Sequence, residues 1–340
     1  MLDDQDVNFI RCNFSPPYLL RNPHTQSILN SIKLRRPIVA HRAREMRAAA
    51  ESHILECGDG VRLQGYFSGH NSKPHNPHPN DLCILIHGWE GSSESSYLLS
   101  AAGKLWDRGM DVFRLNMRDH GPTHHLNEGL FHSCRIDEVV GAVKYIQEQF
   151  PHNRLFLVGF SLGGNFALRV AARARAAGIA LDKAVAICPV LYPPHTMHAM
   201  ETGLKIYHFY FMKKWRNSLR IKRRYFPHLK ALERTSGFKT ISHMTEYFVE
   251  NFTDFPDMRT YLKGYAITGK VLQNLDVSSV IIASTDDPII PAKDLQNLAS
   301  PNSLKIETTR YGGHCGFLQN FRLTSWMDQK IVNLFQKQKG

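Results

Sequence analysis

Apolar and polar residues along the chain fall into blocks that predict strands followed by helices. Short apolar runs such as "LCILIH" (82–87) and "LFLVGF" (155–160) are typical of buried strands, and the longer segments after them carry apolar residues at helical spacing. Further strands are expected at 111–117, 183–190, 278–285 and 303–310. Strands that alternate with helices of about ten or more residues predict an α/β fold, in which a mostly parallel sheet has helices on both faces.

Two other parts of the chain depart from this alternation. The segments "HILEC" (53–57) and "VRLQGYF" (61–67), joined by "GDG", predict an antiparallel hairpin at one edge of the sheet. The long stretch from 192 to 265 separates two of the expected strands, and we interpret it as a helical lid or cap inserted into the fold. We therefore expect residues 1–340 to form a single domain with an insertion at 192–265.

The composition is that of an ordinary globular protein, with 43% hydrophobic and 21% charged residues. No apolar run approaches the ~20 residues that a membrane-spanning helix needs. The first residues, "MLDDQDVNFI", lack the pattern of a secretory signal. Six cysteines are present and none forms a C-x-x-C pair, which disfavours a zinc ribbon or a dithiol redox site. We therefore expect a cytoplasmic protein.

The net charge of +12 comes almost entirely from one segment. Residues 205–239 hold 11 Lys and Arg and a single acidic residue, Glu233, whereas the rest of the chain has a net charge of only +2. A basic surface spread over the whole molecule is therefore not indicated, and we expect no nucleic-acid partner.

The segment "GFSLGG" (159–164) places Ser161 at a tight turn between a buried strand and a helix. In this context the G-x-S-x-G pattern predicts a nucleophilic serine, because side chains at Gly159 and Gly163 would collide with neighbouring backbone. The turn also brings Ser161 to a helix N-terminus, which favours the negative charge of an oxyanion. The alternative is a tight turn whose serine only caps the helix.

A nucleophilic serine needs a base, and the base needs a carboxylate that orients it. In this kind of fold the acid and then the histidine follow the serine along the chain. Asp286 and Asp287 lie in "STDDPIIP" and His314 lies in "RYGGHCGF", each directly after a predicted strand. We choose Asp287 as the acid, because Pro288 and Pro291 would stiffen a loop that holds its carboxylate outward. Asp286 is the alternative.

The oxyanion of the tetrahedral intermediate needs two backbone N–H donors. We expect one from Leu162, the residue after the serine. The second is expected from Trp89 in "HGWEGSS", directly after the strand at 82–87, with Gly88 allowing a close approach.

A second polar cluster, "RDHGPTHHLNEGLFH" (118–132), contains side chains that can bind metals: Asp119, His120, His124, His125, Glu128 and His132. Their spacing matches no known ligand pattern, and a polar loop that borders the active-site cleft explains the cluster equally well. Cys315 follows His314 directly, so the two side chains point in different directions, and we interpret the thiol as a packing residue. We expect neither a metal nor an organic cofactor.

Several of these segments together resemble one family. "HGWEGSS", "GFSLGGN", "DDP" and "GGHCGF", with "LRNPHTQSI" (20–28) and "LFHS" (130–133), look like the YheT-type branch of the α/β-hydrolase superfamily, which includes animal lipid esterases with an AB-hydrolase domain. The resemblance covers most of the chain. It implies the α/β-hydrolase fold with a lid, and a serine esterase acting on acyl esters with Ser161, Asp287 and His314 at the matching positions.

The expected reaction is hydrolysis of an acyl or lipid ester through an acyl-enzyme, carried out by a Ser-His-Asp triad. Two alternatives stay open. The same site could transfer the acyl group to an alcohol other than water, or the protein could be a binding protein that kept the hydrolase fold without turnover.

The basic segment "LKIYHFYFMKKWRNSLRIKRRYF" (204–226) predicts an amphipathic helix. Large apolar residues recur in it at helical spacing: Leu204, Tyr207, Phe211, Trp215 and Leu219. Such a helix suits peripheral contact with an anionic membrane, with its aromatic residues meeting the acyl region. The alternative is that the aromatic residues pack on the core and the Lys and Arg side chains form a solvated outer face.

Overall fold

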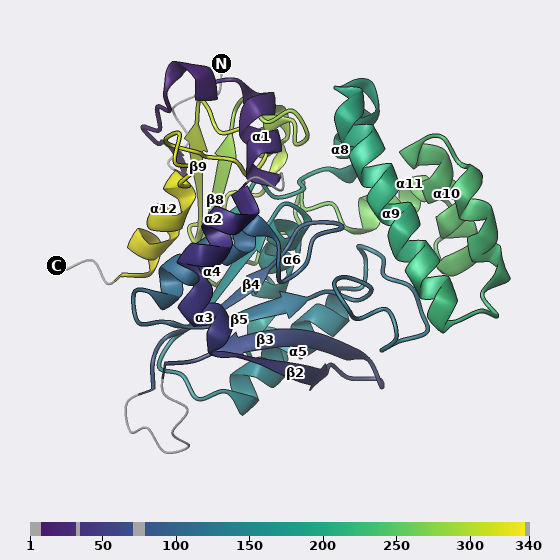
Figure 1. Cartoon of the computed structure of the whole chain (residues 1–340), viewed down its shortest axis with the longest axis horizontal. Helices are drawn as coiled ribbons and strands as arrows, with labels where there is room; N and C mark the ends of the chain where they lie inside the picture. Colours follow the sequence, from purple (N-terminus) through teal and green to yellow (C-terminus); the bar gives the residue numbers. More distant parts are fainter. Residues whose placement is uncertain (1–7, 32–34, 71–78, 337–340) are drawn as a thin grey trace.

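One central sheet organises the computed structural model, which describes residues 8–31, 35–70 and 79–336 (Figure 1). Its nine strands are β1 (Phe9–Arg11), β2 (Ala50–Glu56), β3 (Arg62–Ser68), β4 (Leu82–Ile86), β5 (Asp111–Asn116), β6 (Leu155–Phe160), β7 (Lys183–Ile187), β8 (Ser279–Ser284) and β9 (Leu304–Thr309). Their order across the sheet is β1-β9-β8-β7-β6-β4-β5-β3-β2. The neighbours from β1 to β5 in this order are parallel, so their carboxyl ends meet at one edge, where α/β sheets carry their sites.

The predicted hairpin is confirmed at the end of the sheet. β2 and β3 pair antiparallel, with Glu56 opposite Arg62, and β3 also pairs antiparallel with β5. The fold expectation of a mostly parallel sheet with an antiparallel edge is therefore correct.

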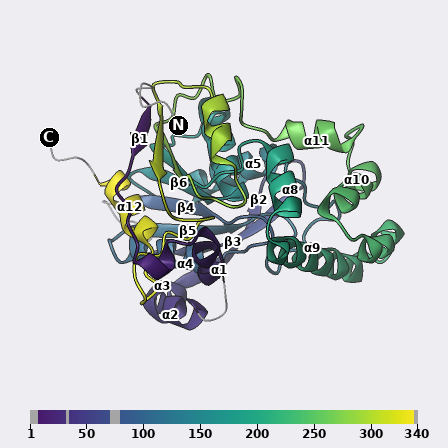
Figure 2. The ribbon, with the colours of Figure 1, turned by 90° about the horizontal axis from the view of Figure 1, so that it is seen from above.

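Helices cover both faces of the sheet, as the alternation predicts (Figure 2). One face carries α2 (Arg35–Arg42), α3 (Arg44–Ala48), α4 (Ser96–Trp106) and α12 (Trp326–Phe335); the other carries α5 (Ile136–Gln149), α6 (Leu162–Ala171) and α7 (Ala174–Ala177). Within β4, Cys83 and Leu85 pack with the first set, whereas Ile84 and Ile86 pack with the second. Burial on both faces explains why the strand reads as a continuous apolar run.

The stretch from 192 to 265 is helical and lies to one side of the sheet in both views (Figures 1 and 2). It contains α8 (Pro193–Thr202), α9 (Lys205–Tyr225), the 3₁₀ segment η2 (Lys230–Gly237), α10 (Ile241–Phe252) and α11 (Met258–Gly264). We call this part the cap. Met200, Trp215 and Phe248 of the cap join the same apolar cluster as α5 and α6, so the cap shares its main core with the sheet.

The N-terminal part holds elements that hydrophobic periodicity does not reveal. β1 is only three residues long and pairs with β9 at the far edge of the sheet. After the 3₁₀ turn η1 (Tyr18–Leu20), α1 (Pro23–Ser31) buries mainly polar side chains, so it carries no apolar stripe. A further 3₁₀ segment, η3 (Ala292–Asn297), lies between β8 and β9.

The start of the chain, on which the expectation of no secretory signal rests, lies mostly outside the described residues. Within the described ranges, no helix combines the length and the hydropathy needed to cross a membrane.

Candidate active site

Ser161 lies at the tip of the turn between β6 and α6, as predicted. Its backbone has φ 54° and ψ −117°, a strained conformation for a residue with a side chain. The turn is held from both sides, because the Ser161 N–H donates to Ile187 O at 2.8 Å and Ser161 O accepts the N–H of Asn165 at 3.1 Å. The hydroxyl is therefore presented in one defined place at the N-terminus of α6.

The two glycines of the pattern are required by space. A Cβ added to Gly159 would lie 2.0 Å from the carbonyl oxygen of Gly163, and one added to Gly163 would lie 2.4 Å from that of His87. Both contacts are with backbone atoms, which cannot turn aside as a flexible side chain could. The glycines thus allow α6 to begin directly against the ends of β4 and β6.

Side chains from three separate segments come together at this turn. His314 Nε2 lies 2.9 Å from Ser161 Oγ, and His314 Nδ1 lies 2.8 Å from Asp287 Oδ2. Ser161 follows β6, Asp287 follows β8 and His314 follows β9, so the ends of parallel strands supply all three groups. An imidazole that donates its Nδ1–H to a carboxylate has Nε2 available to accept the serine proton.

The two aspartates after β8 have different partners. Asp287 Oδ1 accepts two backbone N–H groups from the loop that follows it, at 2.8 and 2.9 Å, which leaves Oδ2 facing His314. Asp286 Oδ1 accepts the N–H of Gly313 at 2.9 Å instead. The geometry therefore places Asp287 at the imidazole, whereas Asp286 supports the loop that carries the histidine.

α1 supports the same histidine loop, a role that the sequence analysis missed. Ser27 Oγ accepts the N–H of His314 at 2.8 Å, and Gln26 Oε1 accepts the N–H of Leu318 at 2.7 Å. Both side chains are buried. They belong to "LRNPHTQSI", which contributed only to the family resemblance; polar residues on the inward side of a predicted helix are the signal that could have indicated the role.

The electrostatics of the site favour a proton on His314. Burial by itself would lower the pKa of the imidazole, but the Asp287 carboxylate and the neighbouring Cys315 outweigh it and raise the pKa well above its ordinary value. A histidine with a raised pKa becomes charged at a pH at which a free imidazole is neutral. As the pH falls, His314 therefore becomes protonated and stops acting as a base at a higher pH than a free imidazole would.

The loop after β4 lies against the serine. A Cβ added to Gly88 would lie 3.2 Å from the Ser161 Cβ. Trp89 follows in this loop and Leu162 begins α6, and within the described part of the chain neither N–H donates to a protein acceptor. The two expected oxyanion donors are therefore next to Ser161 and available to a ligand.

Two cavities reach these side chains. The smaller, of about 90 Å³, is mainly apolar and lies between the sheet and the cap; its walls include Trp89, Ser161, Leu162, Met200, Phe211 and Trp215. The larger, of about 1390 Å³, reaches His314 and extends between α1 and α9. Both aromatic and cationic side chains of α9 line the larger cavity, including Phe209, Tyr210, Lys213 and Arg220.

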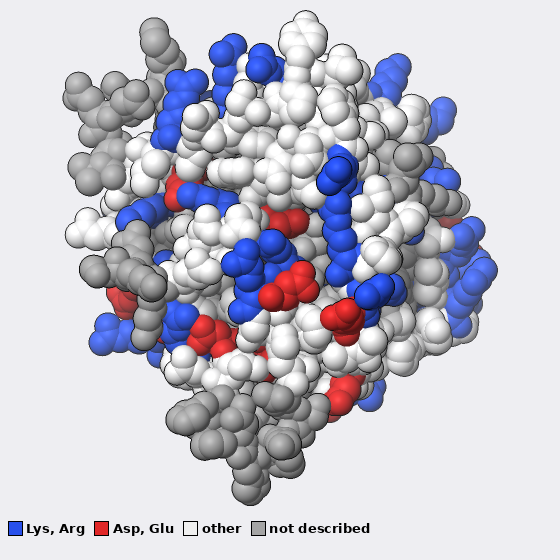
Figure 3. Space-filling view, turned by 60° about the vertical axis from the view of Figure 1, so that its left-hand side comes forward, with Lys and Arg blue, Asp and Glu red and all other residues white. Residues whose placement is uncertain are grey.

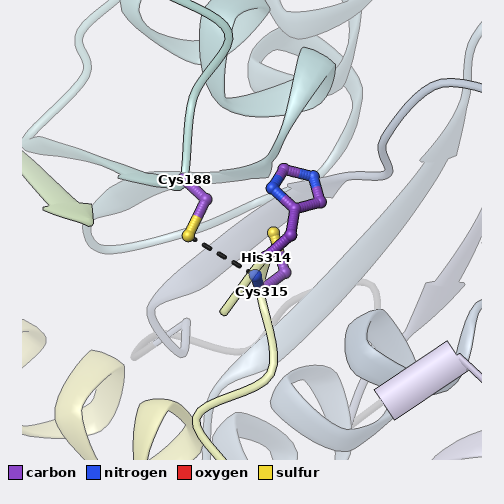
Figure 4. A group of neighbouring side chains, drawn as sticks. All are labelled: Cys188, His314 and Cys315. Carbon is purple, nitrogen blue, oxygen red and sulfur yellow. Dashed lines mark hydrogen bonds between the residues drawn. The ribbon is translucent and has the colours of Figure 1, made fainter. Parts of the chain in front are cut away.

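Two thiols lie close to the imidazole (Figure 4). Sγ of Cys188, Sγ of Cys315 and a ring nitrogen of His314 lie within 4.8 Å of one another, close enough to share a metal ion. However, the two ring nitrogens of His314 already face Asp287 and Ser161, so a metal would have to break those contacts. Cys188 Sγ accepts the Cys315 N–H at 3.4 Å and both thiols are buried, which fits packing under the histidine loop.

The polar loop at 118–132 directs its side chains to different partners. His120 Nε2 accepts the N–H of Glu90 at 3.1 Å, and His124 Nε2 lies 2.9 Å from Ser218 Oγ of the cap. His132 is half-buried beside aromatic rings, and burial lowers its pKa to about 3. The loop thus connects the site to the cap.

The basic segment forms a helix, α9, as predicted, but the faces of the helix are not those expected for membrane contact. Tyr207, Trp215 and Leu219 are buried against the core. This part of the stripe therefore packs inward, in the same apolar cluster as Met200 and Phe248 of the cap. Leu204 of the predicted stripe is exposed, as are Ile206, Phe209, Tyr210 and Tyr225.

The basic residues of α9 also divide into two groups. Lys222 is only 1% exposed and forms an ion pair with Asp119 at 2.8 Å, and Lys214 donates to Glu90 O at 2.7 Å. Arg216 is half-buried and donates to Phe238 O. The exposed group comprises Lys205, Lys213, Arg220, Arg223 and Arg224. On the face drawn in Figure 3, Lys and Arg side chains are dispersed, with acidic side chains among them.

Comparisons with known proteins agree with this architecture. A model of the α/β-hydrolase fold family matches residues 82–221. The chain is 24% identical over 257 residues to the putative esterase YheT of Escherichia coli (strain K12), an alignment that covers 73% of this chain and 74% of that protein. It is 26% identical over 214 residues to the monoacylglycerol lipase ABHD2 of Danio rerio, with 58% of this chain and 50% of that protein covered.

Among solved structures, an esterase of Pyrococcus furiosus has the same fold, with a TM-score of 0.54 over 86% of this chain and 92% of that chain, at 16% identity. The parallel sheet, the turn at Ser161 and these similarities lead to one assignment. The chain has the α/β-hydrolase fold, and its sequence is similar to that of the YheT-type esterases.

Proposed function

We propose that the protein is a serine hydrolase that cleaves acyl or lipid carboxylic esters through an acyl-enzyme. One observation carries the proposal: a line of contacts joins Asp287 Oδ2 to His314 at 2.8 Å and His314 to Ser161 Oγ at 2.9 Å. The relatives named as an esterase and a monoacylglycerol lipase support the same class of reaction.

Acylation follows from this geometry. His314 Nε2 accepts the proton of Ser161 Oγ as the oxygen attacks the ester carbonyl carbon. Negative charge then develops on the carbonyl oxygen, where the N–H groups of Trp89 and Leu162 stabilise it. Asp287 keeps Nδ1–H oriented and stabilises the imidazolium. The imidazolium gives its proton to the departing alkoxide, and the alcohol leaves.

Deacylation repeats these steps with water as the nucleophile. His314 takes a proton from the water, the oxyanion forms again in the same place, and the acid is released as Ser161 regains its proton. Apart from the ester and this water, the proposed steps use only groups of this chain.

The cavities suit an acyl ester. The small apolar cavity begins at Ser161 and Leu162 and suits the acyl chain, while the larger cavity at His314 has room for the alcohol part and for longer chains. Burial of apolar chain in such a cavity favours binding by about 0.8 kcal/mol per CH₂. We therefore expect activity to rise with acyl length until the cavity is filled.

Covalent labelling tests the proposal directly. A fluorophosphonate probe should label wild-type protein at Ser161, and Ser161→Ala should abolish the labelling. A panel of p-nitrophenyl and glycerol esters with graded acyl chains should then be hydrolysed. Absence of both labelling and hydrolysis in folded protein would favour a binding protein. Faster transfer of the acyl group to an added alcohol than to water would favour an acyltransferase.

A further inference from the structure

One face of α9 turns toward the two loops that surround the oxyanion donors. Five residues lie on this face, each three or four positions from at least one other of the set: Phe211, Lys214, Trp215, Ser218 and Lys222. Each contacts the loop after β4 or the loop after β5. The cap is therefore joined to the sheet next to the serine by polar as well as apolar contacts.

The contact with the loop after β4 falls on Trp89 and Glu90. The Trp89 ring stacks on Phe211, with centroids 5.3 Å apart and an angle of 10°, and meets Trp215 edge-on at 5.4 Å. Lys214 Nζ donates to the backbone carbonyl oxygen of Glu90 at 2.7 Å. Glu90 has φ 55°, a left-handed conformation that is strained for a residue with a side chain. Contacts from other segments are therefore needed to hold the backbone of Glu90 in place.

The loop after β5 holds the backbone N–H of Glu90. His120 Nε2 accepts the Glu90 N–H at 3.1 Å, and its Nδ1 donates to Arg118 O at 2.7 Å. Burial lowers the pKa of His120 well below its ordinary value, which keeps Nε2 an acceptor. Glu90 is therefore held at its N–H by the sheet domain and at its carbonyl by the cap.

The loop after β5 is in turn fixed to α9. Lys222 Nζ lies 2.8 Å from Asp119 Oδ1, and Ser218 Oγ donates to Asp119 O at 3.2 Å. Asp119 precedes His120, so the cap also determines where the acceptor for the Glu90 N–H lies. A shift of α9 would move both supports of the loop that carries Trp89.

We propose that Lys214 is a positioning residue for the oxyanion hole: by donating to Glu90 O it fixes the backbone of Glu90, the residue directly after Trp89, and so aims the Trp89 N–H at the substrate. This role rests on the proposed function. Through Lys214 the position of the cap affects the chemical step, because the oxyanion donor Trp89 lies in the loop after β4, whereas Lys214 lies on α9 of the cap.

The test compares Lys214→Gln with Lys205→Gln, a lysine of the same helix that is exposed and is not among the residues lining either cavity. The concentration of active enzyme is measured as the amount of Ser161 that reacts with a fluorophosphonate, and kcat is calculated from that concentration. Unfolded protein, whose serine does not react, is thereby left out of the rate. Lys214→Gln should lower kcat about 10- to 100-fold, less than complete loss of an oxyanion donor usually costs, with KM nearly unchanged. A trifluoromethyl ketone, whose adduct places an oxyanion in the hole, should lose affinity by a similar factor.

Two further results decide between positioning and general stability. Lys214→Arg keeps a donor of similar reach and should restore most of the lost kcat and ketone affinity. The inference is overturned if Lys214→Gln matches Lys205→Gln in kcat and ketone affinity, if it raises KM alone, or if Lys214→Arg is as impaired as Lys214→Gln. An inactive and unlabelled wild-type protein would instead contradict the proposed function.

Discussion

The proton of the Ser161 hydroxyl has His314 Nε2 as its acceptor at 2.9 Å, and the orientation of that imidazole depends on Asp287. Residues connected in this way act as a unit, because each one is useful only when the next is in place. The unit is supported by groups that do no chemistry, among them Ser27 on the N–H of His314 and Asp286 on the N–H of Gly313.

Removing two members of the unit should therefore cost little more than removing one. We expect Ser161→Ala and His314→Ala each to lower kcat on the order of 10⁴-fold or more, and the double variant to be hardly worse than either single one. Steady-state hydrolysis of a p-nitrophenyl ester measures this. Losses that multiply in the double variant would show that the two residues act independently.

The two aspartates should respond differently to amide substitution. Asp287→Asn removes the carboxylate that orients His314, and we expect kcat to fall on the order of 10⁴-fold. Asp286→Asn keeps an oxygen that can accept the Gly313 N–H, so its loss should be far smaller. Kinetics of the two variants decide the assignment, and a larger loss for Asp286→Asn would move the acid by one residue.

The pH dependence follows from the raised pKa of His314. The base must be neutral to accept the serine proton, so kcat/KM should fall as the pH drops through that pKa, which lies above the ordinary imidazole value. Asp287→Asn removes the main charge that raises this pKa, and the acid limb of its residual activity should move to lower pH. An acid limb that stays in place would contradict the role of the Asp287 carboxylate.

At the scale of elements, α9 has three surfaces with different partners. Its inward aromatic residues pack on the core, its Lys214 and Lys222 bind backbone and carboxylate oxygens, and a third set of basic residues, which includes Lys213 and Arg220, is exposed. Of the five residues in the predicted stripe, Tyr207, Trp215 and Leu219 are buried and cannot meet a membrane in this arrangement, whereas Leu204 is exposed. Membrane contact can still be proposed for the exposed surface, which carries Ile206, Phe209 and Tyr210 beside basic side chains.

We propose peripheral binding to anionic membranes through this exposed surface, and liposome co-sedimentation tests it. Each basic side chain near such a membrane contributes about 1 kcal/mol, so binding should weaken steeply with salt. Replacing Lys213, Arg220, Arg223 and Arg224 by Gln should abolish it. The control removes the same number of exposed charges elsewhere: Lys144, Arg175, Lys270 and Lys305 to Gln. Equal binding to neutral vesicles, or equal loss in the control, would count against the proposal.

At the scale of the whole molecule, the cap and the sheet share one apolar core and a buried ion pair between Lys222 and Asp119. We propose that they form one cooperative unit and unfold together. Trp106→Phe with Trp326→Phe leaves Trp89 and Trp215, which lie at the junction, as fluorescent reporters. Fluorescence and far-UV circular dichroism should report coincident transitions in denaturant. Separate transitions would show that the cap unfolds on its own.

Much of this architecture can be predicted from local patterns. β4 and β6 are visible as apolar runs, the hairpin of β2 and β3 is visible from its glycine turn, and the turn at Ser161 is visible because glycine is required on both sides. The N-terminal support of the site is not visible in this way. α1 acts through the polar side chains of Gln26 and Ser27, and hydrophobic periodicity carries no information about hydrogen bonds to distant loops.

The sequence by itself determined the elements, the order of serine, acid and histidine, and the residue types at the turn, because these depend on local sterics and on periodicity. The tertiary structure alone decided which carboxylate faces His314, which side of α9 is buried, and that Lys214 and Lys222 bind the loops beside the serine. These outcomes depend on distances between residues far apart in the chain. A lysine on an amphipathic helix has the same local pattern whether its partner is water or a buried oxygen.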